Sequence, residues 1–131
     1  MTPTNLDGGH MFHFVLVGLG GLIGSLLRYS LGYVLHSEKL TFLPVLLVNF
    51  TGSALIGAII ATPINKSYPN LYLFLVPGFL GGYTTFSTFS AESFLLLQNE
   101  NYSLFLIYLF ASVFGGLAVC ALAYFLMKTA L

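Results

Sequence analysis

The chain has 131 residues, of which 57% are hydrophobic and 6% are charged, and its formal net charge at pH 7 is zero. Soluble domains carry about 25% charged residues, so this composition excludes an ordinary soluble protein. Four basic and four acidic residues create no positive field for nucleic acid, and the single cysteine, Cys120, excludes an intrachain disulfide and a cysteine-based zinc cluster.

Apolar runs separated by short polar stretches dominate the sequence. A membrane-spanning helix needs about 20 apolar residues, and four runs meet this length: residues 12–35, 42–62, 71–97 and 102–127. The connections between them are short, which favours antiparallel neighbours. We therefore predict an all-α membrane protein with one membrane domain over residues 1–131. Because residues 1–11 contain no lysine or arginine, they lack the cationic part of a signal peptide, and we expect the first run to be a retained span.

The first predicted span has small residues at every fourth position. Gly20, Gly24 and Gly32 share this spacing with Arg28, and a GxxxG pattern lets two helix backbones approach closely in lipid. Plain helix packing is the simplest interpretation of these glycines. The second predicted span places Asn49 in an apolar run, with Gly52 and Ser53 about one turn further on.

The third predicted span, 71–97, contains at its centre a run that is a poor continuous helix. Gly81 and Gly82 are followed by β-branched and hydroxyl residues, and Pro77 lacks a backbone donor. We predict that this helix is broken at mid-membrane, although a simple kink would also fit the pattern. Carbonyl groups freed at this depth must line a cavity, bind an ion or lie inside the protein.

Beyond the predicted break, Phe86 and Phe89 share one helix face, and Thr85 and Thr88 share a neighbouring one. Aromatic residues at this spacing usually form core. The ring edge, however, carries the positive part of the aromatic quadrupole, so paired edges can face a small anion without a formal charge. Such weak contacts suit conduction, because a full charge would bind the ion too tightly to release it.

Polar residues of the spans occur at a common depth when residues are counted from the loops at about 1.5 Å each. Intramembrane polar residues at one depth favour a functional pathway over scattered helix contacts. We expect the two charged members, Arg28 and Glu92, to pair with each other or to reach an aqueous vestibule. The residues at this depth are Arg28, Asn49, Glu92 and Tyr108, and Ser112 follows Tyr108 by one turn.

The distribution of basic residues does not select a membrane orientation. Lys66 and Lys128 lie on one predicted side, and Lys39 and Arg28 lie on or near the other. Orientation normally follows an excess of lysine and arginine on the cytoplasmic side. A chain that inserts both ways can pair with its inverted copy about a dyad in the membrane plane.

These motifs together resemble the Fluc family of bacterial fluoride channels. The resemblance rests on Gly24 with Arg28 and Tyr29, on Asn49 with Gly52 and Ser53, and on the run from Gly78 through Ser90 with Glu92. It covers about 115 residues when the four-span plan is included, and the run in the third span is its most specific part.

The resemblance implies a dual-topology homodimer in the bacterial inner membrane that exports toxic fluoride passively through two pores. It further implies a structural sodium ion bound by the backbone carbonyls of Gly81 and Thr84. The implied fluoride pathway, to which we add the hydroxyls of Thr85 and Thr88, consists of Phe86, Phe89, Asn49, Tyr108 and Ser112. Two departures from the family pattern are Gly116, where some relatives have a second pore serine, and Tyr83, which is often an apolar residue.

Two other classes of membrane protein deserve comparison. Small multidrug transporters have four short spans but need a carboxylate in the first one, and residues 12–35 contain none. A membrane scaffold would need neither a polar layer nor a broken helix. We predict no enzymatic activity, because no nucleophile has a base and an orienting group in reach, and we expect fluoride, membrane lipid and a second copy of the chain as partners.

Overall fold

The structure, a computed structural model, describes residues 8–131, and these form helices with no strand among them. The expectation that residues 1–11 are no signal peptide falls mostly on residues 1–7, which lie outside the described residues. In chain order the elements are α1 (Gly8–Val34), α2 (Leu43–Ile60), α3 (Ile64–Ser67), α4 (Pro69–Leu73), the π-helical η1 (Phe74–Leu80), α5 (Gly81–Tyr83), α6 (Phe86–Gln98), α7 (Tyr102–Phe110), the π-helical η2 (Ala111–Gly115) and α8 (Gly116–Ala130).

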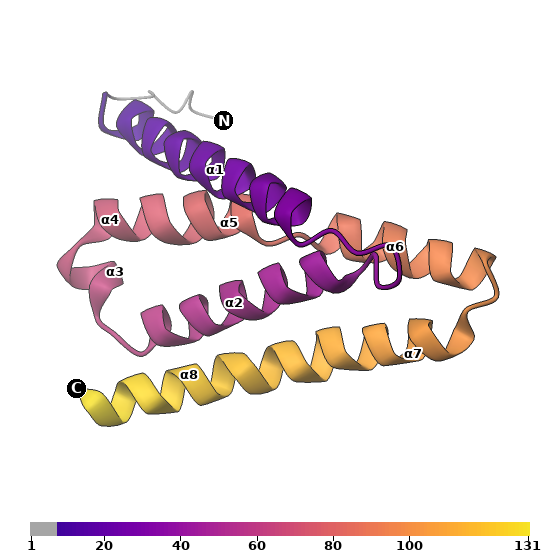
Figure 1. The fold of residues 1–131 in the computed structure, drawn as a ribbon. Coiled ribbons are helices and arrows are strands. Elements are labelled where there is room, and N and C mark those ends of the chain that lie inside the picture. Colours follow the sequence, from indigo (N-terminus) through magenta and orange to yellow (C-terminus); the bar gives the residue numbers. More distant parts are fainter. Residues whose placement is uncertain (1–7) are drawn as a thin grey trace, which may run out of the picture.

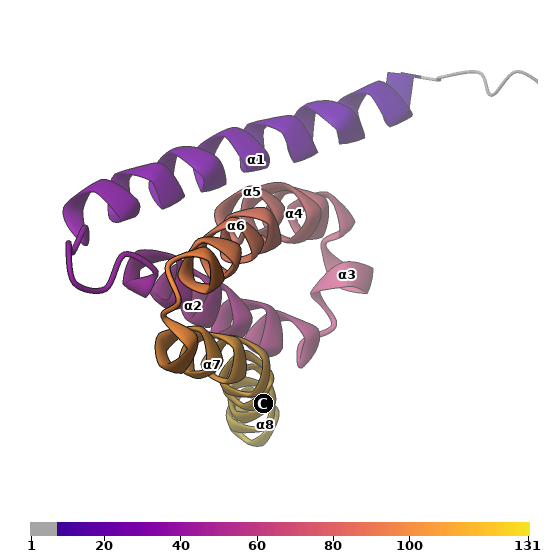
Figure 2. The same ribbon diagram turned by 90° about the vertical axis from the view of Figure 1, so that its right-hand side faces the viewer.

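The elements form four columns that alternate in direction (Figure 1). The start of α1, the α3–α4 corner and the C-terminus lie at one end, and the α1–α2 connection and the α6–α7 turn lie at the other. The column from α4 to α6 lies between α1 and α2, and the column from α7 to α8 lies against α2 (Figure 2). The short connections therefore produce antiparallel neighbours.

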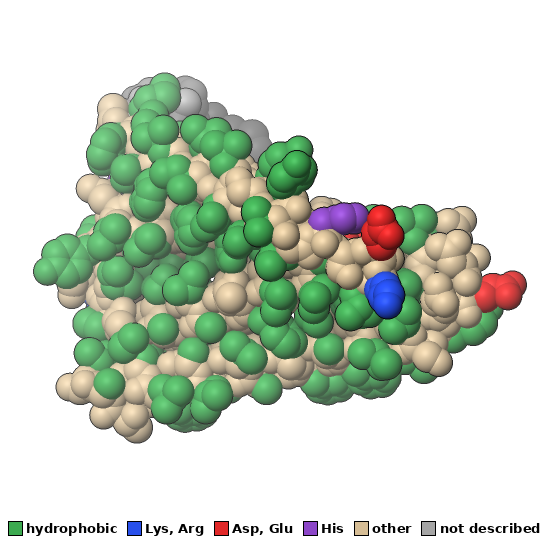
Figure 3. All heavy atoms as spheres, in the orientation of Figure 1, with side chains coloured by type: hydrophobic (Ala, Val, Ile, Leu, Met, Phe, Trp, Pro, Cys, Tyr) green, Lys and Arg blue, Asp and Glu red, His purple; other side chains and the backbone are tan. Residues whose placement is uncertain are grey.

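Three helical stretches are long and apolar enough to cross a membrane: α1, α2 and the continuous helix Tyr102–Ala130 that joins α7, η2 and α8. The predicted span 71–97 corresponds to the interrupted column of α4, η1, α5 and α6. Its passage through the membrane stays a prediction. On the face shown in Figure 3, charged side chains gather over the α1–α2 connection and the α6–α7 turn, and hydrophobic side chains cover most of the rest.

Glycines allow α1 to contact the neighbouring column backbone to backbone. Gly20 and Gly24 are the buried residues of α1, and a Cβ atom on either would collide with a carbonyl oxygen, of Phe74 or of Phe79. The packing interpretation is thus confirmed for these two glycines. For Gly32 it stays a prediction, because an added Cβ would meet no atom of the described chain within 4 Å.

The α6–α7 turn fixes the direction of the last column. Glu100 has a positive φ of 57°, and its N–H donates to Leu97 O while Asn101 N donates to Leu96 O at 2.9 Å. This pair of bonds is the Schellman arrangement, which satisfies the last carbonyls of α6 and reverses the chain. It brings Tyr108 of α7 back alongside α6.

Candidate functional site

The third column leaves the helical conformation at Thr84 and Thr85. Their φ and ψ angles are −80° and 158°, and −150° and 118°, so both residues have extended backbone. The break therefore lies after the glycines on which it was predicted, because Gly81 and Gly82 are still helical in α5. Pro77 also stays within a helix, since it lies in η1, where a wider turn accommodates a residue that cannot donate a bond.

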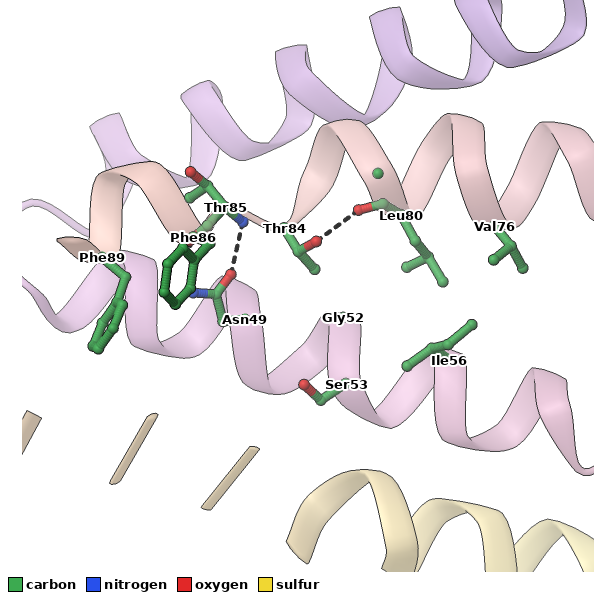
Figure 4. A pocket seen from close by; sticks show the side chains of 11 residues that line it. Asn49, Gly52, Ser53, Ile56, Val76, Leu80, Thr84, Thr85, Phe86 and Phe89 are labelled. Carbon is green, nitrogen blue, oxygen red and sulfur yellow. Dashed lines mark hydrogen bonds between the residues drawn. The ribbon is translucent and has the colours of Figure 1, made fainter. Parts of the chain in front are cut away.

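The side chain of Asn49 in α2 bonds the backbone of Thr85 at this break (Figure 4). Its side-chain Oδ1 accepts from Thr85 N at 2.9 Å, and its Nδ2 donates to Thr85 O at 3.1 Å. The Thr85 side chain then caps α6, because its Oγ1 accepts from Thr88 N at 3.2 Å. A single amide side chain thus replaces part of the helical ladder where the helix is interrupted.

Gly81 O and Thr84 O are among the carbonyl groups that lose their usual helical donors at the break. Thr85 N would bond Gly81 O in a continuous helix but bonds Asn49 instead, and Thr88 N would bond Thr84 O but bonds the Thr85 hydroxyl. In the described part of the chain, neither Gly81 O nor Thr84 O accepts a backbone bond across the break. These are the same two carbonyls that the family resemblance implies as cation ligands.

Arg28 and Glu92 do not pair with each other within the described residues, so the first of the two expected arrangements is not found, and access to a vestibule stays a prediction. Arg28 donates from Nε to Gly82 O at 3.1 Å and thereby satisfies a third carbonyl beside the break. Glu92 accepts a bond of 2.7 Å from the hydroxyl of Tyr108. Both charged residues are half-buried, and each has found a neutral partner on a neighbouring column.

The aromatic residues form a chain from the break toward α7. The ring centroids of Phe86 and Phe89 lie 5.5 Å apart with the planes tilted by 45°. Phe89 meets Tyr108 edge-on at 5.0 Å, and Tyr108 stacks on Phe42 at 4.6 Å. Phe89 and Tyr108 are buried, whereas 78% of Phe86 is exposed in the single chain.

A hollow of about 410 Å³, here named the Asn49 hollow, opens beside the break (Figure 4). Among residues 8–131, no ionisable residue lines it. A second hollow of about 360 Å³, named the Arg28 hollow, contains Arg28 and Thr88. Of the predicted hydroxyl pair, Thr85 lines the first hollow and Thr88 the second, and the two hydroxyls are hydrogen-bonded to each other at 3.0 Å. The Asn49 hollow is lined by Asn49, Gly52, Ser53, Ile56, Val76, Leu80, Gly81, Thr84, Thr85, Phe86 and Phe89.

Sequence reasoning missed two polar features of the site. The hydroxyl of Tyr83, which departs from the family pattern, lies 2.8 Å from that of Thr51, and its ring stacks on Phe79. The hydroxyl oxygens of Ser93 and Ser112 are buried without a partner among the described residues. Only Ser112 was expected in the pathway. The signal for Ser93 was its position one turn after Phe89 on the same helix face.

The chain was compared with known proteins. The family model described as CrcB-like protein, Camphor Resistance (CrcB), matches residues 15–124. A protein from Gloeothece citriformis named fluoride-specific ion channel FluC is 40% identical over 90% of this chain and 98% of its own length. Similarly named proteins from Listeria monocytogenes and Thermus thermophilus are 40% and 41% identical, over 82% and 87% of this chain and 92% and 94% of their own lengths.

Replacing Asn49 with Leu should destabilise the break. The substitution keeps the bulk but leaves the N–H of Thr85 without a partner, and an unsatisfied buried group costs about 1–3 kcal/mol. We expect a lower unfolding temperature and faster hydrogen exchange at the Thr85 amide, measured by mass spectrometry in detergent. The control is Thr62→Val, which removes a hydroxyl that bonds Ile59 O just after the end of α2 and far from the break. Unchanged Thr85 exchange in Asn49→Leu would contradict the role of Asn49.

Proposed function

Since the chain belongs to the CrcB family, we propose that it is a fluoride-selective ion channel. It is a multi-pass membrane protein of an ion-channel family, not an enzyme. The Asn49 hollow supports the proposal most directly, because an amide, hydroxyls and aromatic rings line it without any ionisable residue. Neutral donors and ring edges stabilise a small anion yet permit its release.

The side chains of the hollow can supply donors to a dehydrated fluoride. Asn49 uses one of its two amide N–H groups on Thr85 O, so the other remains for an anion. The edges of Phe86 and Phe89 provide the positive part of their quadrupoles. Tyr108 meets Phe89 edge-on, and the buried hydroxyl of Ser112 follows Tyr108 by one turn without a protein partner. Fluoride then passes along neutral groups from one helix to the next.

Physiologically, we propose passive export of fluoride across the bacterial inner membrane, which protects the cell from its toxicity. A passive channel needs no free titrating carboxylate inside the pathway. Glu92 does not line the Asn49 hollow, and its carboxylate accepts a hydrogen bond from the hydroxyl of Tyr108. This arrangement also argues against a proton-coupled drug transporter, the other four-span class considered from the sequence.

The working unit in this proposal is an antiparallel homodimer with all four columns crossing the membrane and two separate pores. The hollow is open in the single chain, and Phe86 at its edge is 78% exposed, so a second copy would complete the wall. The inverted pairing is supported by the balance of Lys66 and Lys128 against Lys39 and Arg28.

Dual insertion can be tested by labelling single cysteines. In a Cys120→Ala background, Thr41→Cys and Ser67→Cys place thiols at exposed positions in connections at opposite ends of the columns. We expect a membrane-impermeant maleimide to label part of each population on intact cells, and the remainder after lysis. Labelling of one variant only, and completely, from outside would rule out dual insertion.

A structural sodium ion between the two copies is also proposed. The carbonyl oxygens of Gly81 and Thr84 fit a hard monovalent cation, because both have lost their helical donors. Bound there, the ion would neutralise the carbonyl dipoles that gather at the break. The residues that free these carbonyls are Asn49 and Thr85, so the side chains act on the cation only indirectly.

Exchange of sodium for a bulky organic cation should lower the unfolding temperature of the purified dimer. A ligand present at 100 times its Kd stabilises the folded state by about 2.7 kcal/mol. The measurement is thermal unfolding in detergent as a function of sodium concentration, with gel filtration to follow dissociation. Identical unfolding curves with sodium and with N-methylglucamine would remove the cation from the proposal.

Fluoride efflux from liposomes tests the function and the two phenylalanines together. The reconstituted protein should release fluoride and retain chloride. Phe86→Ile and Phe89→Ile should each abolish most of the flux, because Ile fills similar space but has no electropositive ring edge. Met should give intermediate rates, since its polarizable sulfur partly replaces the aromatic contact.

The matched control for these variants is Phe94→Ile on the same helix, which lies outside the Asn49 hollow and should conduct like the wild type. We expect every variant to assemble, because an apolar swap of similar volume usually costs less than about 1.5 kcal/mol of stability. Gel filtration checks this assembly. If both Ile variants conduct normally, the rings are only packing, and the anion path runs along Thr85, Thr88 and Ser112.

A further inference from the structure

Six hydroxyl groups of this protein bond a carbonyl three or four residues earlier in the chain. This local bond uses the hydroxyl proton and leaves nothing for a ligand. The residues with such a bond are Ser25, Ser30, Thr51, Thr62, Ser90 and Thr129. Ser53, near the middle of α2, is not among them. No hydrogen bond of its hydroxyl is found within residues 8–131, as is also the case for the buried hydroxyls of Ser93 and Ser112.

Ser53 lines the Asn49 hollow one turn after Asn49 (Figure 4). The other two hydroxyls there have committed protons: Thr84 donates to Leu80 O at 2.9 Å, and Thr85 donates to Thr88 Oγ1 at 3.0 Å. Of the hydroxyls that line this hollow, Ser53 is therefore the one whose proton remains for an anion.

The position of Ser53 also continues the row of donors on the last column. Gly116 follows Ser112 by four residues and has no side chain, so the last column offers no hydroxyl at that position. A Cβ atom built on Gly116 would lie 3.7 Å from Ser53 Oγ, with no closer neighbour. The hydroxyl of α2 thus occupies the space beside Gly116 into which a side chain of that residue would point.

We propose that Ser53 is a fluoride-coordinating residue that supplies, from α2, the hydroxyl that the last column lacks at Gly116. The proposal rests on the channel function proposed above. It assigns the anion a continuous series of neutral donors, with the free amide hydrogen of Asn49 and the hydroxyl of Ser53 on one helix and Ser112 on the facing one.

A hydroxyl exchange between the two helices tests this assignment. Ser53→Ala should lower the rate of fluoride efflux about tenfold, the loss expected for a hydrogen bond to a charged group. Ser53→Ala combined with Gly116→Ser should restore most of the flux, because it returns a hydroxyl to the same space from α8. Ser53→Ala combined with Gly116→Ala adds the Cβ without the hydroxyl and should stay slow.

Gel filtration and thermal unfolding of each variant separate lost conduction from lost assembly. The control Ser90→Ala removes a hydroxyl that bonds Phe86 O within its own helix and should conduct normally. If the wild-type protein releases fluoride, then a wild-type rate in Ser53→Ala, or equal rates in the two double variants, would overturn the assignment of Ser53. A wild-type protein that releases no fluoride would instead refute the channel function itself.

Discussion

The structure depends on how polar backbone groups are satisfied where a helix is interrupted among apolar residues. An unpaired peptide group in such surroundings costs several kcal/mol, so the interruption exists only where partners come from other columns. Asn49 and Arg28 supply them from α2 and α1, and the Thr85 side chain supplies one from the break itself. Three columns are thereby tied to one short segment, and the hollow lies beside it.

The close packing of the glycines serves the same end. Arg28 can reach Gly82 because α1 lies almost against the backbone of the third column at Gly24. On the other side, a Cβ on Gly52 would collide with the Thr84 methyl group, so α2 also approaches the break without an intervening side chain. The short side chain of Asn49 can then bond the extended backbone of Thr85. The chain of aromatic rings runs from Phe86 at the break to Phe42 at the start of α2.

Much of this plan was accessible from the sequence. Apolar runs gave the columns to within a few residues, and the glycines, threonines and Pro77 pointed to an irregular backbone in 71–97. The pairing of side chains was less accessible. Arg28 and Glu92 invited a pairing by charge, yet each bonds a neutral group, because partners depend on how neighbouring helices are rotated. Periodicity within one helix carries no information on that rotation. Thr85 and Thr88 line different hollows for another reason, because Thr85 has extended backbone before α6 begins, so helical spacing does not relate it to Thr88.

The π-helical turns have a consequence for the spacing of residues along a column. In an α-helix every fourth residue overshoots a full turn by about 40°, so a row of such residues winds around the axis. A π turn takes in one residue more and offsets this drift. Such a turn, η2, lies between Tyr108, which stacks on Phe42 at the start of α2, and Gly116, which lies beside Ser53 of α2. Loss of one residue there would rotate the rest of the column by about 100°. The length of this apolar segment is thus constrained more strictly than its composition, and insertions or deletions should be rarer there than substitutions.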